Sequence, residues 1–398
     1  MPPVQTAPKP ARAVIVGNGA PAGRRPKKRK APLWTKLLTV FGLVLTLASV
    51  AGIVSVKYFM GQLTENIQTT SGVLDDGNVA SKTTASGKLP DGAMNLLMLG
   101  LDTRTGWEDR GVLSRSDTIM IMHLNKAHDQ AYMISIPRDT IAHIPADKSL
   151  NFGGSTEKIN GAYAHGSKDG KGWTGGAKLA TKTVHELTGI DFDGVVVIDF
   201  DGFKGMLEAM GGVHMCVDKD MWSSHYTVDS KGKVSYAKGA DPTYPPRNAL
   251  WFKKGCRDME AWEALEFSRL RHSANGDYDR QRHQQQLLRA MAKKATSAGV
   301  LTNPSKAGKI MSAAGSSLKM DTHGVPINDF IFGLKDIAAA DLIPIKTNNG
   351  TFASASGGEG IAPATQEMFD ATAGDNLQEF LANHPEMLIN DGETASKS

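Results

Sequence analysis

Arginine and aspartate side chains gather near the ends of several apolar segments of this sequence. Arg115 and Asp117 precede one segment, Arg138 follows another, and Asp102 ends a third. The other candidates lie downstream and are Arg269, Arg271, Arg280, Arg282 and Gln284.

Several guanidinium groups that converge suit a diphosphate, because each offers a planar fork that matches phosphate oxygens. Two carboxylates beside them could hold Mg²⁺, which completes its shell with water and phosphate oxygens. The pattern predicts a phosphoryl-transfer site, where the protein positions groups and neutralises developing charge.

Each of these residues also has a simpler interpretation. Aspartate and arginine near each other are most often surface ion pairs that contribute about 0–1 kcal/mol. Asp139, which follows Arg138, is expected to be such an ion-pair partner and to orient the arginines. Gly100, which a tight turn explains equally well, receives no role.

Three predicted strands would bring the first candidates together. The continuous apolar run at 94–102 is typical of a strand buried on both faces, and 117–124 and 131–137 are separated by a short polar turn. In a hairpin the entrance of one strand and the exit of its neighbour lie at the same end of the sheet. Asp102, Asp117 and Arg138 are therefore expected at one edge.

Strands alternate with helices along the rest of the chain. Strands are predicted at 195–200 and 213–217, and helices at 175–190, 202–210, 259–270 and 277–295. This alternation predicts an α/β fold, an α-β-α layered sandwich with a central mixed sheet.

The charge distribution is uneven. The chain has 45 Lys and Arg against 41 Asp and Glu, for a formal net charge of +4. Residues 1–33 hold about eight positive charges and no acid, so the remainder carries about −4. This excludes a nucleic-acid binder of the histone kind, and no nucleic-acid partner is expected. Hydrophobic residues at 40% exclude a wholly disordered chain.

An uncharged apolar segment follows the basic tail. Residues 34–57 contain a run of about 20 uncharged residues, enough for a helix to cross a membrane. A cleavable signal peptide is the alternative, but its apolar region usually spans only about 7–15 residues. The positive-inside rule predicts a single-pass type II protein of the cell membrane, with 1–33 in the cytoplasm and the rest outside. A Ser/Thr/Gly-rich stalk is predicted at 58–90 and a polar, disordered tail at 377–398.

Cys216 and Cys256 are the only cysteines. Both fall in the predicted extracellular part, where oxidation is permitted, so we expect a disulfide; two free buried thiols are the alternative. Their spacing gives no metal-site motif.

The ordered motifs NLLMLGLDTR, SRSDTIMIMHLN, SIPRDT, KINGAYAHG, GVVVIDFDGF, GGVHMCV, EALEFSRLRHS and DYDRQRHQQQLL resemble the LytR-CpsA-Psr family of membrane-anchored cell-wall ligases. The resemblance covers residues 91–376. It implies a Mg²⁺-dependent phosphotransferase that moves a secondary cell-wall glycopolymer, such as a teichoic acid, from a polyprenyl-pyrophosphate carrier onto peptidoglycan. Partners would be the lipid-linked polymer, peptidoglycan and the cytoplasmic membrane.

The resemblance also implies roles for individual residues. Asp102 and Asp117 would hold Mg²⁺, and with Arg138 they would form the catalytic centre. Residues that correspond to the family's pyrophosphate ligands are Arg115, Arg138, Arg269, Arg271, Arg280 and Gln284, with Arg282 adjacent. Asp102, Asp117 or a metal-bound hydroxide could be the general base.

Three points stay open. A pyrophosphatase of the lipid carrier would use the same residues, and a non-catalytic binder or regulator is a second alternative. The aromatic stretch 218–257 is expected to be a surface loop held by the disulfide, with an acceptor contact as the alternative.

Overall fold

The computed structural model describes residues 67–74, 92–103, 113–237, 243–273, 275–300, 303–325 and 341–389. The predicted cytoplasmic tail (1–33) and membrane span (34–57) lie outside these residues. Within the described ranges, no helix has the length and apolarity that a bilayer crossing requires.

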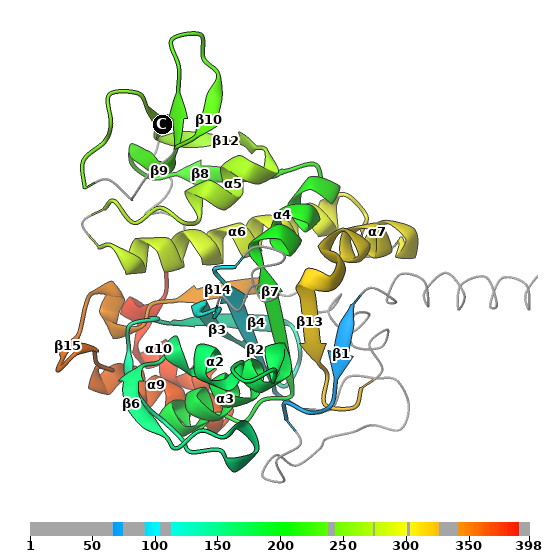
Figure 1. Ribbon diagram of the computed structural model, residues 1–398, viewed down its shortest axis with the longest axis vertical. Helices are drawn as coiled ribbons and strands as arrows, with labels where there is room; N and C mark the ends of the chain where they lie inside the picture. Colours follow the sequence, from blue (N-terminus) through cyan, green and yellow to red (C-terminus); the bar gives the residue numbers. More distant parts are fainter. Residues whose placement is uncertain are drawn as a thin grey trace, which may run out of the picture. The chain divides into compact units, whose positions relative to one another are not determined.

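The described elements follow one another along the chain as strands and helices (Figure 1). The strands are β1 (Gln68–Thr70), β2 (Met94–Leu101), β3 (Ser116–Leu124), β4 (Gln130–Ile136), β5 (Ile141–Ile144), β6 (Ser155–Lys158), β7 (Gly194–Asp199), β8 (Val213–Val217), β9 (Met221–Val228), β10 (Val234–Tyr236), β11 (Ala249–Phe252), β12 (Gly255–Met259), β13 (Leu318–Asp321), β14 (Asp341–Ile345), β15 (Ser354–Ala355) and β16 (Gly358–Glu359). The α-helices are α2 (Gly161–Gly166), α3 (Gly172–Thr188), α4 (Phe200–Ala209), α5 (Ala261–Phe267), α6 (Asp277–Ser297), α7 (Pro304–Ala314), α9 (Pro363–Ala373) and α10 (Leu377–Asn383). Short 3₁₀ turns are η2 (Lys148–Leu150), η3 (Gly315–Ser317), η4 (Asn348–Gly350) and η5 (Pro385–Met387).

A mixed sheet of seven strands forms the centre, in the order β1-β13-β7-β2-β3-β4-β14. The β2–β3–β4 part is antiparallel, as the predicted hairpin requires, whereas β7 runs parallel to β2 and β14 runs parallel to β4. The antiparallel β2–β3 pair therefore places the end of β2 beside the start of β3.

Apolar side chains cover both faces of this sheet. In β2, Leu97 and Leu99 pack on one side with Leu179 of α3 and Phe369 of α9, whereas the alternate residue Leu96 packs on the other. The second side is covered by α4, α6 and α7, as Figure 1 shows. Strand side chains alternate between the two faces of a sheet. The sequence of a strand that is covered on both faces is therefore a continuous apolar run. The predicted layered α/β fold is confirmed.

A smaller lobe, which consists of β8–β12 and α5, packs on the side of α6 that faces away from the sheet. Leu287 and Met291 of α6 share a core with Phe252 of β11 and Phe267 of α5, while Leu288 faces the sheet. Residues 218–257 are not the predicted surface loop, since β9, β10 and β11 form a three-stranded sheet within them. The difference arises because this segment has a buried side, which includes Met221, Trp222 and Phe252.

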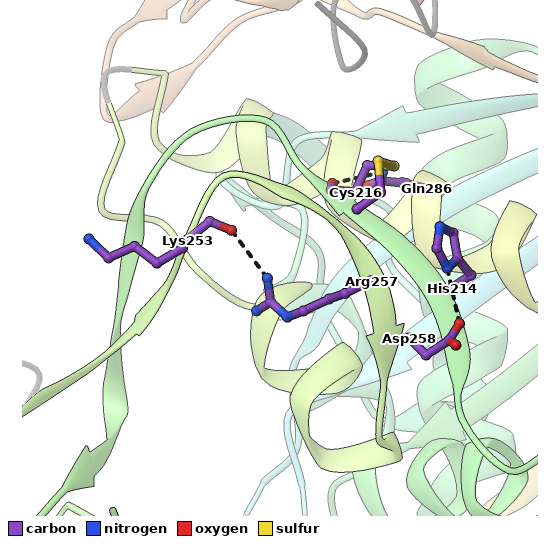
Figure 2. The surroundings of a disulfide bond; sticks show 7 residues. His214, Cys216, Lys253, Arg257, Asp258 and Gln286 are labelled. Atoms are coloured by element: carbon purple, nitrogen blue, oxygen red, sulfur yellow. Dashed lines mark hydrogen bonds and ion pairs between the residues drawn. A yellow bond between two sulfur atoms is a disulfide. The ribbon is translucent and has the colours of Figure 1, made fainter. Parts of the chain in front are cut away.

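The predicted disulfide is present in this lobe (Figure 2). Cys216 of β8 and Cys256 of β12 lie directly opposite each other in an antiparallel pair, with sulfurs 2.01 Å apart. Gln286 of α6 donates a hydrogen bond to the Cys216 carbonyl at 3.0 Å, which ties the bridge to the helix. The helix predicted from residue 259 begins instead at Ala261, because Met259 still pairs with Val213.

Ordered elements lie on both sides of the predicted catalytic domain (91–376). Within the predicted stalk (58–90), β1 pairs with β13, and the backbone N–H groups of Val73 and Leu74 donate to Asp321 at 2.8 and 3.2 Å. Within the predicted polar tail (377–398), α10 and η5 bury Leu381 and Met387 in the main core. Both segments are short and mostly polar, so their overall composition does not reveal the few apolar side chains that they bury.

Candidate active site

A cavity of about 200 Å³ lies between the sheet and the helices on its α6 side. Its walls come from β2, β3, β7, α4, α5, α6, β9 and the segment that follows α5. The apolar lining includes Met98, Met120, Val196, Ile198, Phe203, Leu287 and Leu288. The polar lining contains six of the residues singled out from the sequence, namely Asp102, Asp117, Arg269, Arg271, Arg280 and Gln284. Segments far apart in the chain thus converge on one cavity.

The two aspartates come from neighbouring strands. Leu101 pairs with Ser116, so Asp102 leaves β2 where Asp117 enters β3, and the register shifts between Gly100 and Leu101. A side chain at Gly100 would place its Cβ 2.9 Å from Cβ of Thr118. This close approach, rather than a tight turn, explains the glycine.

Arginines surround Asp117. Arg138 Nη1 donates to Asp117 Oδ2 at 2.5 Å, and Arg271 Nη2 lies 3.8 Å from the same oxygen. Burial lowers the pKa of the Arg271 guanidinium, and the positive charges of Arg280 and Arg138 lower it further. Three cations thus lie close enough to repel one another, an arrangement that favours an anionic ligand.

Two further contacts hold arginines at the cavity. Arg280 is only 4% exposed and its Nη2 lies 2.8 Å from Asp277 Oδ1. Arg269 lies 3.5 Å from Asp102 and its guanidinium is 4.0 Å from the Phe200 ring centroid. Both side chains are therefore oriented before any ligand arrives.

Several buried polar atoms of these residues lack a hydrogen bond among the described residues. They are Nε of Arg138, Nε of Arg280 and Oε1 of Gln284. A buried donor or acceptor without a partner costs about 1–3 kcal/mol. Two of these residues, Arg280 and Gln284, line the cavity, which indicates a site that a polar ligand completes.

Three predicted ligands do not line the cavity, although one of them, Arg138, contacts the Asp117 carboxylate that does. Arg115 is exposed and does not line the cavity. Arg282 was expected beside the pyrophosphate, but its Nη2 binds Asp218 at 2.7 Å and Asp279 at 3.2 Å, outside the cavity. The reason is helical geometry, because Arg280 and Arg282 are two positions apart and project from different faces of α6.

Asp139 behaves as expected of an ion-pair partner. Its carboxylate lies 2.9 Å from Lys158 Nζ and 3.9 Å from Arg138 Nε. It thereby adds a second, more distant negative charge beside the Arg138 guanidinium.

The sequence did not indicate two further residues, one that contacts the cavity's Arg280 and one that lines the cavity itself. Asp277 stands one helical turn before Arg280, a spacing that the sequence does show. His225 of β9 lines the cavity and its Nδ1 is 3.1 Å from Glu266 of α5. No local pattern could find this pair, because the two residues are 41 positions apart.

Comparison with known proteins gives a consistent result. A model described as the LytR_cpsA_psr family matches residues 48–357. "Probable cell wall biosynthesis protein LcpB" of Corynebacterium glutamicum is 29% identical over 62% of this chain, and the match spans about half (51%) of LcpB. "Polyisoprenyl-teichoic acid--peptidoglycan teichoic acid transferase TagU" of Oceanobacillus iheyensis is 29% identical over 74% of this chain and 78% of TagU.

A solved structure shares the fold. The crystal structure of TagV from B. subtilis aligns with a TM-score of 0.50 at 22% identity, and the alignment covers 73% of this chain and 99% of TagV. This likeness supports the layered architecture with its mixed sheet.

Proposed function

The chain belongs to the LytR_cpsA_psr family, and we propose that it transfers a cell-wall glycopolymer from a polyprenyl-pyrophosphate carrier onto peptidoglycan. One observation carries the proposal: Arg271 and Arg280 line a mostly apolar cavity, Arg138 contacts the Asp117 carboxylate in its wall, and the charges of Arg138 and Arg280 act on Arg271. A pyrophosphate that joins a lipid to a polymer combines the same two features, because its doubly esterified head is a dianion and its lipid is a hydrocarbon chain.

The two parts of the cavity suit the two parts of such a donor. The apolar residues of β2, β3, β7 and α6 would contact the polyprenyl chain, and burial of each CH₂ contributes about 0.8 kcal/mol. The arginines would bind the pyrophosphate through charge-assisted hydrogen bonds. The name of the relative TagU, a teichoic acid transferase that acts on peptidoglycan, supports the same chemistry.

The reaction that we propose is a displacement at phosphorus. A sugar hydroxyl of peptidoglycan attacks the polymer-proximal phosphorus, and the bond from this phosphorus to the bridging oxygen breaks. Polyprenyl phosphate leaves with that oxygen, and a phosphodiester joins polymer to acceptor. Arg138, Arg271 and Arg280 would offset the charge that develops on the leaving group.

Asp102 and Asp117 fit a Mg²⁺ site. Both are carboxylates that line the cavity at the same end of β2 and β3, and their side chains are 49% and 13% exposed. Hard oxygen ligands with room for water and phosphate are what Mg²⁺ prefers. The bound ion would supply further positive charge at the pyrophosphate.

Membrane anchoring is part of the proposal. Residues 34–57 would hold the chain in the cell membrane as a single-pass type II protein, with residues 58–398 outside. The disulfide between Cys216 and Cys256 supports an extracellular, oxidising location.

The test uses the purified full-length chain in detergent. The donor is farnesyl pyrophosphate linked to N-acetylglucosamine, with Mg²⁺ and with or without soluble peptidoglycan fragments. We expect sugar phosphate joined to the acceptor and farnesyl phosphate released, and a loss of at least about 100-fold in Asp117→Asn and Arg138→Gln. Arg257→Gln is the matched control, because Arg257 of β12 donates to the Lys253 carbonyl at 3.1 Å, outside the cavity (Figure 2).

Other outcomes would replace the proposal. Farnesyl phosphate released equally with and without acceptor, with no product on the acceptor, would identify a pyrophosphatase. Binding of the donor without turnover in either condition would identify a non-catalytic binder. Omission of Mg²⁺ tests the metal separately, since full activity in excess chelator would contradict the Asp102 and Asp117 site.

A further inference from the structure

A histidine and a buried glutamate form a pair in the wall of the cavity. Nδ1 of His225 lies 3.1 and 3.2 Å from the two carboxylate oxygens of Glu266. The Glu266 side chain is 1% exposed and that of His225 is 28% exposed. The hydroxyl of Ser223 also donates to Glu266, so the carboxylate is held from two directions.

This contact fixes the protonation pattern of the imidazole. A carboxylate accepts hydrogen bonds, so the neutral ring carries its proton on Nδ1 and leaves Nε2 as an acceptor. A histidine oriented in this way by a buried carboxylate is the arrangement of a general base. Among the described residues, Nε2 of His225 has no hydrogen-bond partner.

The pair belongs to the wall of the candidate active-site cavity. His225 and Ser224 line the same cavity as Asp102, Asp117 and Arg269. His272, which also lines the cavity, stacks on Trp222 of β9 with ring centroids 3.8 Å apart. The small lobe thus contributes one wall and the sheet contributes the opposite one.

Aromatic rings flank His225 on the lobe. Tyr236 of β10 is 49% exposed and stacks on His225 at 6.3 Å. Tyr226 contacts both Tyr236, at 5.4 Å, and Trp262, at 5.3 Å. Amphipathic rings of this kind suit an acceptor sugar, which has both apolar C–H faces and hydroxyl groups.

We propose that His225, held by Glu266, is a catalytic residue that accepts the proton of the acceptor hydroxyl; this rests on the proposed transferase function. As the hydroxyl oxygen forms its bond to phosphorus, its proton moves to Nε2 and the phosphorus–oxygen bond to polyprenyl phosphate breaks. The imidazolium that forms is stabilised by the Glu266 carboxylate and later loses its proton to water. Asp102 and Asp117 then do not have to accept this proton and can bind Mg²⁺ beside the pyrophosphate.

Other charged groups act on the same imidazole. Glu266 approaches from α5, and Arg269 and His272 from the segment that follows α5. Tyr236 approaches from β10, and Lys204 of α4 and Arg269 both act on the neighbouring Tyr226. A pH profile therefore needs the His225 variant as its reference, because other charged groups surround the same imidazole.

The experiment compares His225→Gln with His214→Gln in the full-length chain. His214 of β8 forms a similar pair with Asp258, at 3.0 Å, but both side chains are exposed and neither lines the cavity (Figure 2). Transfer to peptidoglycan fragments and binding of the farnesyl-pyrophosphate donor are measured for both. We expect His225→Gln to lower kcat for transfer by at least about 100-fold with unchanged donor affinity, and His214→Gln to match the wild type.

Two further measurements distinguish chemistry from structure. Transfer by the wild type should fall on acidification as the histidine is protonated, and this loss should disappear from the residual activity of His225→Gln. Added imidazole should restore part of the transfer rate of His225→Ala, which a merely structural role would not allow. A wild-type rate in His225→Gln, or a failure of imidazole to restore His225→Ala when this variant still binds donor, would overturn the inference and leave the transferase intact. A wild type that transfers nothing would instead overturn the proposed function, and this inference with it.

Discussion

Arg271 and Arg282 lie in the same segment of the chain, but their electrostatic surroundings are opposite. Arg271 faces Arg138 and Arg280, and burial together with these charges lowers its pKa. Arg282 instead binds two carboxylates, at 2.7 and 3.2 Å. Cations that repel one another, as around Arg271, favour the binding of an anion. An arginine paired with carboxylates, such as Arg282, instead stabilises the folded state.

We therefore expect Arg271→Gln to weaken binding of farnesyl pyrophosphate by about 10-fold or more, since a hydrogen bond to a charged group contributes about 1.5–3 kcal/mol. The free energy of unfolding should stay the same or rise slightly, because repulsion with Arg280 and Arg138 is removed. Isothermal titration calorimetry and urea unfolding measure the two effects.

Arg282→Gln is the control with the reverse expectation. It removes the arginine from Asp218 and leaves Asp279 with Lys219 alone, so the free energy of unfolding should fall by about 3 kcal/mol. Affinity for farnesyl pyrophosphate should change little. If Arg282→Gln lost affinity and kept its stability, Arg282 would belong to the site after all.

At the scale of elements, α6 is bound to the small lobe by charge as well as by apolar contacts. Asp279 of α6 lies 2.6 Å from Lys219, which precedes β9. Burial raises the pKa of Asp279, but hydrogen bonds with Lys219 and Ser273 and the charge of Arg282 outweigh it and lower the pKa to about 2. Asp218 shifts in the same direction, because the His283 hydrogen bond and the Arg282 charge outweigh its burial.

This shift predicts how stability depends on pH. A carboxyl whose pKa is lower in the folded state stabilises the protein fully above its unfolded pKa, near 4, and loses this contribution as pH falls toward 2. For Asp279 the contribution is about 2 kcal/mol. We expect Asp279→Asn to flatten the acid side of the stability profile between about pH 5 and pH 2, measured by urea unfolding. Asp258→Asn is the control, because this side chain on β12 is 93% exposed; an equal effect there would contradict the assignment.

The sequence predicts well those elements that have a clear pattern of apolar residues or a residue that typically ends a helix. The apolar runs of β2, β3 and β4 identify buried strands, and α3 ends at Gly189, whose φ of 69° is the left-handed cap that the sequence suggests. The β9 strand was missed, because its outward residues are polar and aromatic and resemble a loop. The convergence of Asp117 with Arg271 and Arg280 follows from family resemblance, whereas the His225–Glu266 pair depends on a lobe whose packing no local pattern encodes.

At the scale of the whole molecule, the segment after α9 covers one edge of the central sheet. β14 is an edge strand, and Leu388 pairs with Ile345 beside it. The N–H of Lys346 donates to the Met387 carbonyl at 2.7 Å, and the N–H of Ile389 donates to the Pro344 carbonyl at 3.0 Å. Edge strands expose unpaired backbone groups, so this segment protects the sheet from pairing with another chain.

A chain that ends at residue 376 should therefore be unstable and prone to aggregate. It loses the buried side chains of Leu377, Leu381 and Met387, which are 1%, 4% and 0% exposed, at about 1.5–3 kcal/mol each. It also uncovers the outer edge of β14. We expect a fall of at least about 5 kcal/mol in the free energy of unfolding, measured in urea, and growth of particles in light scattering. A chain that ends at residue 389 keeps every one of these contacts and should match the full-length protein. Equal stability of the two shortened chains would show that the domain ends where its composition turns polar, not where its sheet is closed.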